Sequence, residues 1–162
     1  MNEPSTELKK LSWIVGLVAK IMMIASIAFI AYLLILLANV ILHPVLVVNG
    51  SILTADICIT NLAMWLLLFA IMYCLNRLFT NICKSGLPFT KENADYLSII
   101  AVLIVVYALG LPLLAWVAAL TFANSGHVYF DLFLLFIAFL VYVISLVFKY
   151  GTVLQKESDE TL

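Results

Sequence analysis

Residues 21–55 read IMMIASIAFIAYLLILLANVILHPVLVVNGSILTA and contain no Asp, Glu, Lys or Arg. A membrane-crossing helix needs only about 20 consecutive apolar residues, so this run of 35 is long enough to contain one. A soluble domain of 162 residues could not hide such a run, because small domains bury only about two-thirds of their chain surface. The stretch therefore predicts a membrane-spanning helix followed by an apolar link.

Three further uncharged runs follow along the chain, at residues 57–76, 96–130 and 132–148. Hydrophobic residues make up 66% of the sequence and charged residues 10%, whereas soluble proteins have about 45–50% and about 25%. The runs are continuously apolar instead of alternating, which favours helices over a β-barrel. We therefore predict an all-α integral membrane protein. It is a single domain, 1–162, with four transmembrane helices at about 14–42, 59–80, 96–122 and 130–149, and with tails at 1–13 and 150–162.

The basic residues are distributed unevenly between the links. They lie in the two tails, at the start of the first span and around the link between the second and third spans: Lys9, Lys10, Lys20, Arg77, Lys84, Lys91, Lys149 and Lys156. The links at about 43–58 and 123–129 have none. The positive-inside rule therefore predicts that both termini and the middle link are cytoplasmic. The expected location is the bacterial cytoplasmic membrane.

The first outer link contains a turn signal. Asn49-Gly50 separates the apolar segments 45–48 and 51–54. Asn-Gly suits a type I′ turn, in which both central residues need positive φ. We expect a short β-hairpin here, lying on the outer surface.

The sequence lacks the usual catalytic motifs and has only scattered potential metal ligands. The sequence contains no H-E-x-x-H, P-loop or G-x-S-x-G motif, and no carboxylate lies well inside a predicted span. Five potential metal ligands fall on the outer side: His43, Asp56, Cys58, His127 and Asp131. They come from separate links without close ligand spacing, so a zinc or copper site is the less favoured interpretation. We expect no metal, no cofactor and no catalytic residue, and we do not expect an enzyme.

The third span carries a seam of small residues and a proline. Ala101, Ala108 and Ala115 are seven residues apart, and small residues let helices approach closely in lipid. Pro112 should kink the helix in its outer half. Kinked packing is the favoured interpretation, and a gating hinge is the alternative.

The two segments expected at the cytoplasmic face have the most specific sequence. Residues 84–93 read KSGLPFTKEN, in which Thr90 stands at an N-cap position and Asn93 at the capping-box position. Residues 148–162 read FKYGTVLQKESDETL. Gly151 either closes the last helix, or the helix continues into the polar tail.

Together these segments resemble a bacterial membrane family known as domain of unknown function 2975. The resemblance rests on a link of the type G-x-P-F-T-x-E-N and an ending of the type F-x-Y-G-x-x-L-Q-x-E-x-D-x-T, placed among four spans in about 160 residues. The matching residues are Gly86, Pro88, Phe89, Thr90, Glu92, Asn93, Phe148, Tyr150, Gly151, Leu154, Gln155, Glu157, Asp159 and Thr161. The resemblance implies no activity. It implies that such a protein is often encoded beside a small helix-turn-helix regulator.

The sequence is therefore consistent with two functions. The first is an interaction or regulatory protein that docks a cytoplasmic partner, such as a small helix-turn-helix regulator, on residues 81–95 and 150–162. The candidate docking residues are Gly86, Pro88, Phe89, Thr90, Glu92, Asn93, Tyr150, Gly151, Leu154, Gln155, Glu157 and Asp159. Mixed charges favour a protein partner over nucleic acid or anionic lipid, which would need a basic cluster. The alternative is a small transporter, channel or export accessory subunit, acting as a homo-oligomer.

Overall fold

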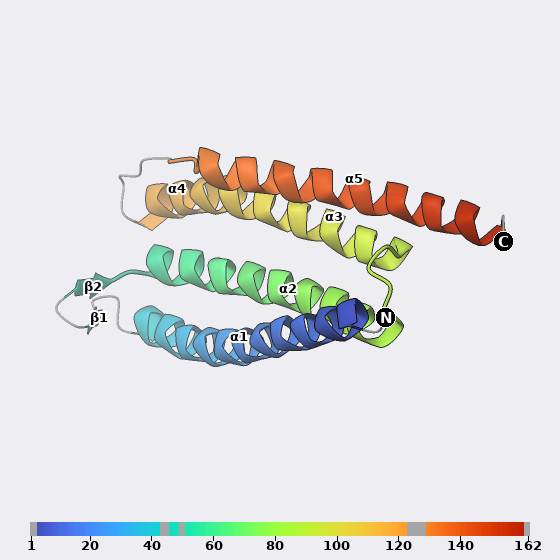
Figure 1. Cartoon of the computed structure of the whole chain (residues 1–162). Coiled ribbons are helices and arrows are strands. Elements are labelled where there is room, and N and C mark those ends of the chain that lie inside the picture. The colour runs from blue at the N-terminus through green and yellow to red at the C-terminus, as the bar shows by residue number, and fades with distance from the viewer. Residues whose placement is uncertain (1–2, 43–45, 49–50, 123–128, 161–162) are drawn as a thin grey trace.

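The computed structural model describes residues 3–42, 46–48, 51–122 and 129–160 (Figure 1). Its elements, in chain order, are α1 (Glu3–Leu42), β1 (Leu46–Val48), β2 (Ser51–Leu53), α2 (Ala55–Ser85), α3 (Lys91–Val105), a π-helix (Val106–Gly110), α4 (Leu111–Phe122) and α5 (Leu132–Glu160).

Four helical segments in the described part of the chain are long and apolar enough to cross a membrane. They are Lys9–Leu42, Ala55–Ser85, Lys91–Thr121 and Leu132–Ser158. The third of these comprises all of α3, the π-helix and α4 as far as Thr121. Many large apolar side chains on these helices are exposed, which suits contact with lipid. The predicted helical architecture, with four helices long and apolar enough to span a membrane, is confirmed.

The helices are longer than the predicted spans. The first helix begins at Glu3 instead of 14, and the last ends at Glu160 instead of 149. Of the two alternatives for Gly151, the structure therefore has the helix continuing. Ion pairs spaced at helical intervals support the polar ends, since Lys10 lies 3.3 Å from Glu7 and Lys156 lies 3.7 Å from Glu160. Apolarity alone does not detect such ends, which is why the expected tails were too long.

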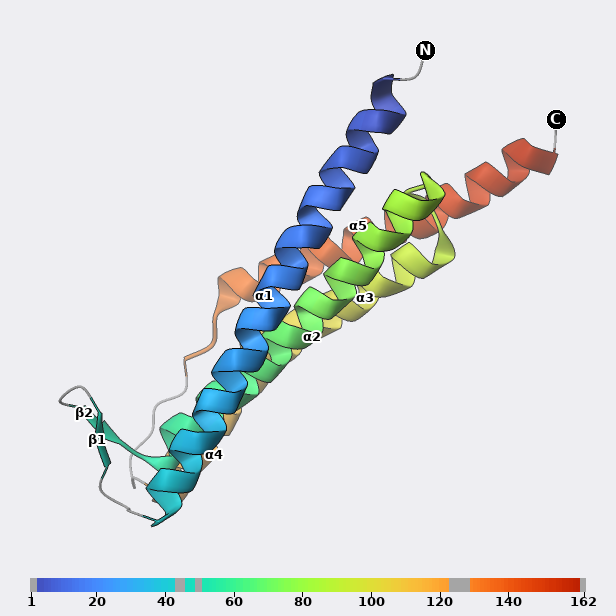
Figure 2. The same ribbon diagram turned by 90° about the horizontal axis from the view of Figure 1, so that it is seen from below.

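The helices pack side by side in a row. Helix α1 packs on α2, α2 packs on α3 and α4, and α3 packs on α5. Figure 1 shows α1 and α5 at opposite margins of this row, and Figure 2 shows that they cross at an angle. Both termini and the α2–α3 link lie at one end, called here the terminal end. The strands lie at the other end.

A seven-residue repeat explains how α1 meets α2. The buried residues of α1 include Ser12, Ala19, Ser26, Leu33 and Val40, each seven residues after the last. Such a repeat keeps one narrow seam against a neighbouring helix along the whole length. Small residues at the seam allow close approach of the backbones. Farther along the pair, the Phe29 and Trp65 rings stack with centroids 4.4 Å apart.

The third membrane segment is interrupted by the π-helix, two residues before Pro112. Proline has no N–H to donate to the carbonyl four residues earlier, so the regular hydrogen-bond pattern must change there. The break was expected from Pro112, but the π-helix was not. Of the predicted alanine seam, Ala101 and Ala108 are buried, whereas Ala115 is half-buried and Ala118 is buried farther on. The wider π-turn changes the register, so the seven-residue pattern does not continue into α4.

The strands β1 and β2 form an antiparallel pair in which Val47 is opposite Ile52. The expected turn at Asn49-Gly50 lies outside the described residues. Its type, and the face of the membrane on which the strands lie, stay predictions.

Candidate functional site

The α2–α3 link begins with Gly86, whose backbone adopts the left-handed conformation. Gly86 has φ 69° and ψ 2° and caps the C-terminus of α2, where its N–H donates to the Ile82 carbonyl at 2.8 Å. A residue with a Cβ is strained at this φ, so glycine is favoured. The Lys9 side chain of α1 comes close, because a Cβ placed on Gly86 would lie 3.5 Å from Lys9 Cε. The N-terminal helix therefore reaches the link.

The link ends with the expected cap. Thr90 has extended backbone angles, and its Oγ1 accepts from the Asn93 N–H at 3.2 Å. The predicted N-cap of α3 is confirmed. The expected capping box is not formed, because the Asn93 side chain reaches past Thr90 and donates to the Pro88 carbonyl at 2.9 Å. The Thr90 N–H also donates to Pro88, at 3.1 Å.

The two sequence segments meet in space through an aromatic clamp, which consists of Phe89, Phe148 and Gly151. The rings of Phe89 and Phe148 lie with centroids 5.1 Å apart in an edge-to-face arrangement. A Cβ placed on Gly151 would lie 2.7 Å from Phe89 Cδ1 and 3.3 Å from Phe89 Cβ. Only glycine permits this approach. The clamp therefore joins the α2–α3 link to α5.

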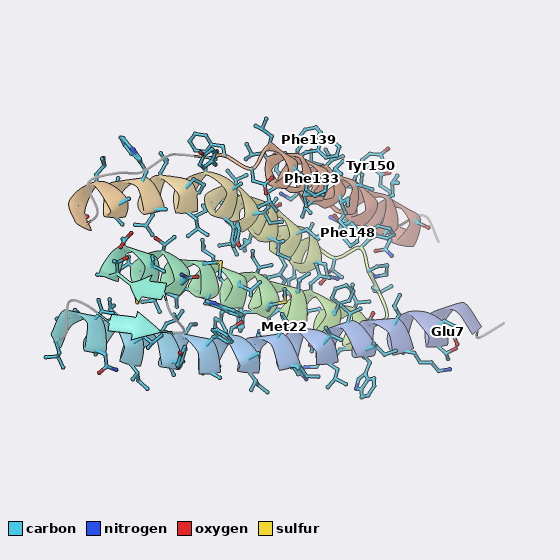
Figure 3. The ribbon with its side chains drawn as sticks, turned by 90° about the vertical axis from the view of Figure 1, so that its left-hand side faces the viewer. Glu7, Met22, Phe133, Phe139, Phe148 and Tyr150 are labelled. Carbon is cyan, nitrogen blue, oxygen red and sulfur yellow. The ribbon has the colours of Figure 1, made fainter. Side chains whose placement is uncertain are left out.

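Beyond the clamp, α5 continues past the α2–α3 link at the terminal end (Figure 1). Tyr150, Val153 and Leu154 are exposed on this part of the helix, and Tyr150 is 65% exposed. Their spacing of three and four residues places them on one face. Figure 3 shows Phe148 on the side of α5 that faces the link, and Tyr150 on the opposite side. One face of this part of α5 therefore packs against Phe89, and the opposite, apolar face is exposed.

The remaining candidate residues of α5 lie beyond the clamp. Gln155 is half-buried and Glu157 is exposed. Asp159 belongs to α5, but its side chain lies outside the described part of the chain. These residues continue the projecting helix without joining the clamp.

The first turn of α3 contains a buried amide. Asn93 is 0% exposed, and its Oδ1 has no hydrogen-bond partner among the described residues. Next to it, Glu92 Oε2 accepts from Asn81 Nδ2 at 3.0 Å, which links the first turn of α3 to the last turns of α2. Asn81 lies within the expected docking segment 81–95 but was not singled out as a candidate. Its position five residues before a turn-forming Gly-x-Pro was the only signal.

The outer group of potential metal ligands is not assembled in the described residues. His43 and His127 lie outside them. Asp131 instead caps α5, where its Oδ1 accepts from the Leu134 N–H at 3.1 Å. Cys58 is buried in α2. Within the part of the chain that the structure describes, no three His, Cys, Asp or Glu residues are grouped to hold a metal ion.

Comparisons with protein family models, with curated proteins and with solved structures found no match. The role of the terminal end is therefore inferred from its geometry and charges.

Proposed function

We propose that the chain is a multi-pass protein of the bacterial cytoplasmic membrane that docks a soluble regulatory protein at its terminal end. The cytoplasmic orientation and membership of the family known as domain of unknown function 2975 are parts of this proposal. The observation that carries it is the exposed face of Tyr150, Val153 and Leu154 on the projecting end of α5.

The length of α5 supports a position of this face at and beyond the edge of the membrane. Its 29 residues extend about 43 Å at 1.5 Å per residue, whereas the hydrocarbon core is about 30 Å thick. Lys149 and Lys156 flank the face and suit the headgroup layer and water. Apolar anchors spaced at i, i+3 and i+4 are typical of a helix that binds in the groove of a partner.

The clamp gives this helix a fixed direction. Phe89 packs on Phe148 and against Gly151, so the projecting segment cannot rotate without moving the α2–α3 link. A helix held in place loses less conformational entropy when it binds. The clamp therefore supports docking by preorganisation.

The charge of the projecting segment favours a basic partner. Residues 150–160 contain one lysine, Lys156, against the three carboxylates Glu157, Asp159 and Glu160. A helix-turn-helix regulator is basic on the surface that meets DNA phosphates. Docking on an acidic helix would cover that surface, so the membrane protein would hold the regulator away from DNA.

A matched pair of double variants tests the docking face. Tyr150→Ser with Leu154→Ser removes two anchors, while Phe139→Ser with Val143→Ser removes two exposed apolar residues at the same spacing inside the span. The tagged full chain is captured from gently solubilised native membranes, and the regulator encoded beside it is quantified. We expect the first variant to lose the regulator and the second to keep it. Equal capture by both would contradict docking on this face.

The orientation needs a different probe from the native cysteines, because Cys58 is buried and a poor target for a thiol reagent. In a chain with its cysteines replaced by Ala, Tyr129→Cys and Tyr150→Cys place one exposed thiol on each side of the expected fourth span, 130–149. An impermeant reagent on intact cells should label the first and spare the second. The reverse pattern would overturn the orientation.

One observation favours the alternative of a transporter or channel. The π-helix borders a groove of 310 Å³ whose lining includes Tyr107, Thr60 and Asp131. Single π-turns occur frequently at functional sites, and a carboxylate at such a groove could contact a cation. Asp131→Asn should abolish ion flux into proteoliposomes if transport is the function, and should leave regulator capture unchanged if docking is the function.

A further inference from the structure

A second polar feature lies at the terminal end, on the margin of the row away from α5. It is a groove of 180 Å³ between α1 and α2. Its lining includes Ser12, Trp13, Lys20, Thr80 and Lys84. A single water needs only about 10–15 Å³, so the groove has room for a larger polar group.

The lysines of this groove are unpaired among the described residues. Ion pairs in that part of the chain are Lys10 with Glu7 and Lys156 with Glu160, and neither involves Lys20 or Lys84. A neighbouring groove is lined by Lys84, Lys91 and Glu92, so there too lysines outnumber carboxylates. The unmatched positive charge favours an anion.

The carboxylates of the C-terminal segment are separated in space from the lysines of the groove. They lie on the projecting end of α5, at the opposite margin of the row (Figure 1). The α1–α2 side has the unpaired Lys20 and Lys84, while Glu92 stays beside Lys84 in the neighbouring groove. The expectation that mixed charge disfavours anionic lipid was based on sequence order, and the fold moves the C-terminal carboxylates away from the groove.

We propose that this groove binds the phosphate of an anionic phospholipid headgroup. Lys20 and Lys84 flank the phosphate, and the hydroxyls of Ser12 and Thr80 are donors in the wall. Basic pockets between membrane helices are typical binding sites for such headgroups. Trp13, which is 62% exposed, suits the same layer of the bilayer.

A further observation favours a lipid over free phosphate. Leu17, Ile21 and Ile24 are exposed on α1 and extend from the groove toward the middle of the membrane, where an acyl chain would run. Free phosphate has no apolar part that would use this surface.

The test compares two double variants of equal charge. Lys20→Gln with Lys84→Gln removes the lysines of the groove, and Lys149→Gln with Lys156→Gln removes two lysines of α5. The full chain in detergent is titrated with short-chain phosphatidylglycerol, phosphatidylcholine or inorganic phosphate, and bound lipid is counted by native mass spectrometry. Thermal unfolding without lipid checks that each variant is folded.

We expect phosphatidylglycerol to bind the wild type and the α5 variant alike. The groove variant should bind about 25-fold more weakly, at roughly fivefold for each lysine near an anionic headgroup. Equal weakening in both variants, or equal binding of phosphatidylcholine, would overturn the site. Competition by inorganic phosphate at the lipid's own concentration would show a free-anion site and overturn the lipid assignment.

Discussion

The two outer pairs of the row are held together in different ways. Helix α1 meets α2 through a regular seam in which Ser12, Ala19 and Ser26 repeat every seven residues. Helix α5 also meets α3 through small buried residues seven apart, Ala138 and Ser145. It adds individual contacts, namely the aromatic clamp and the hydrogen bond between Ser98 and Ser145. A seam spreads its stabilisation over many small contacts, whereas these added contacts concentrate it at a few residues. Single substitutions should therefore distinguish the two pairs.

The sharpest contrast is between two helical glycines. In Gly151→Ala the new Cβ would lie 2.7 Å from Phe89, and the nearby Phe89 Cβ prevents the ring from simply swinging away. We expect a loss of about 1–3 kcal/mol of unfolding free energy, measured in detergent micelles. In Gly16→Ala the nearest atom is 3.9 Å away, so a gain of about 0.5–1 kcal/mol is expected. Combining Gly151→Ala with Phe89→Leu should recover stability. Equal effects at the two glycines would contradict the clamp.

Two fully buried polar residues give the next contrast. Asn93→Ala removes the hydrogen bond to the Pro88 carbonyl and leaves a cavity, so we expect a loss of about 1–3 kcal/mol. Ser26 in α1 donates only to Met22 of its own helix, at 2.8 Å. Ser26→Ala should change the stability by less than about 0.5 kcal/mol. Thermal unfolding of both variants under the same conditions measures the difference.

The helix caps provide a third pair. Thr90 accepts from the Asn93 N–H, whereas Thr54, the N-cap of α2, makes no side-chain capping bond. Thr90→Ala should therefore cost about 0.5–2 kcal/mol, and Thr54→Ala close to nothing. Amide hydrogen exchange should show faster exchange in the first turn of α3 only. A comparable effect at both threonines would indicate that capping is not the cause.

The smallest expected effect belongs to the hydrogen bond between α3 and α5. Ser98 Oγ donates to Ser145 Oγ at 3.1 Å, and Ser145 is fully buried. Such bonds between membrane helices contribute about 0.6 kcal/mol on average. Ser145→Ala should cost about that amount. A double-mutant cycle with Ser98→Ala isolates the pair, and a coupling near zero would show that the two serines stabilise their own helices instead.

Local signals in the sequence predicted local structure well. The uncharged runs located the four membrane segments, and the Thr90 cap followed from its place before α3. The clamp could not be predicted, because Phe89 and Gly151 are far apart in the chain and meet only when α5 lies beside the link. The π-helix was missed because Pro112 signals a break without specifying its form. The groove at Lys20 and Lys84 was missed because it needs the pairing of α1 with α2.

The row arrangement described above also bears on how the chain assembles during synthesis. Each membrane segment after the first packs on the one made just before it, so α1 and α2 can associate as soon as both have emerged. Their contacts are short-range in sequence order, which favours fast folding. Helix α5 packs on α3, in the segment made just before it, and also on Phe89 in the link that precedes α3. The last helix to be synthesised therefore completes the assembly, and a ribosome that stops before Phe148 leaves the clamp half-formed.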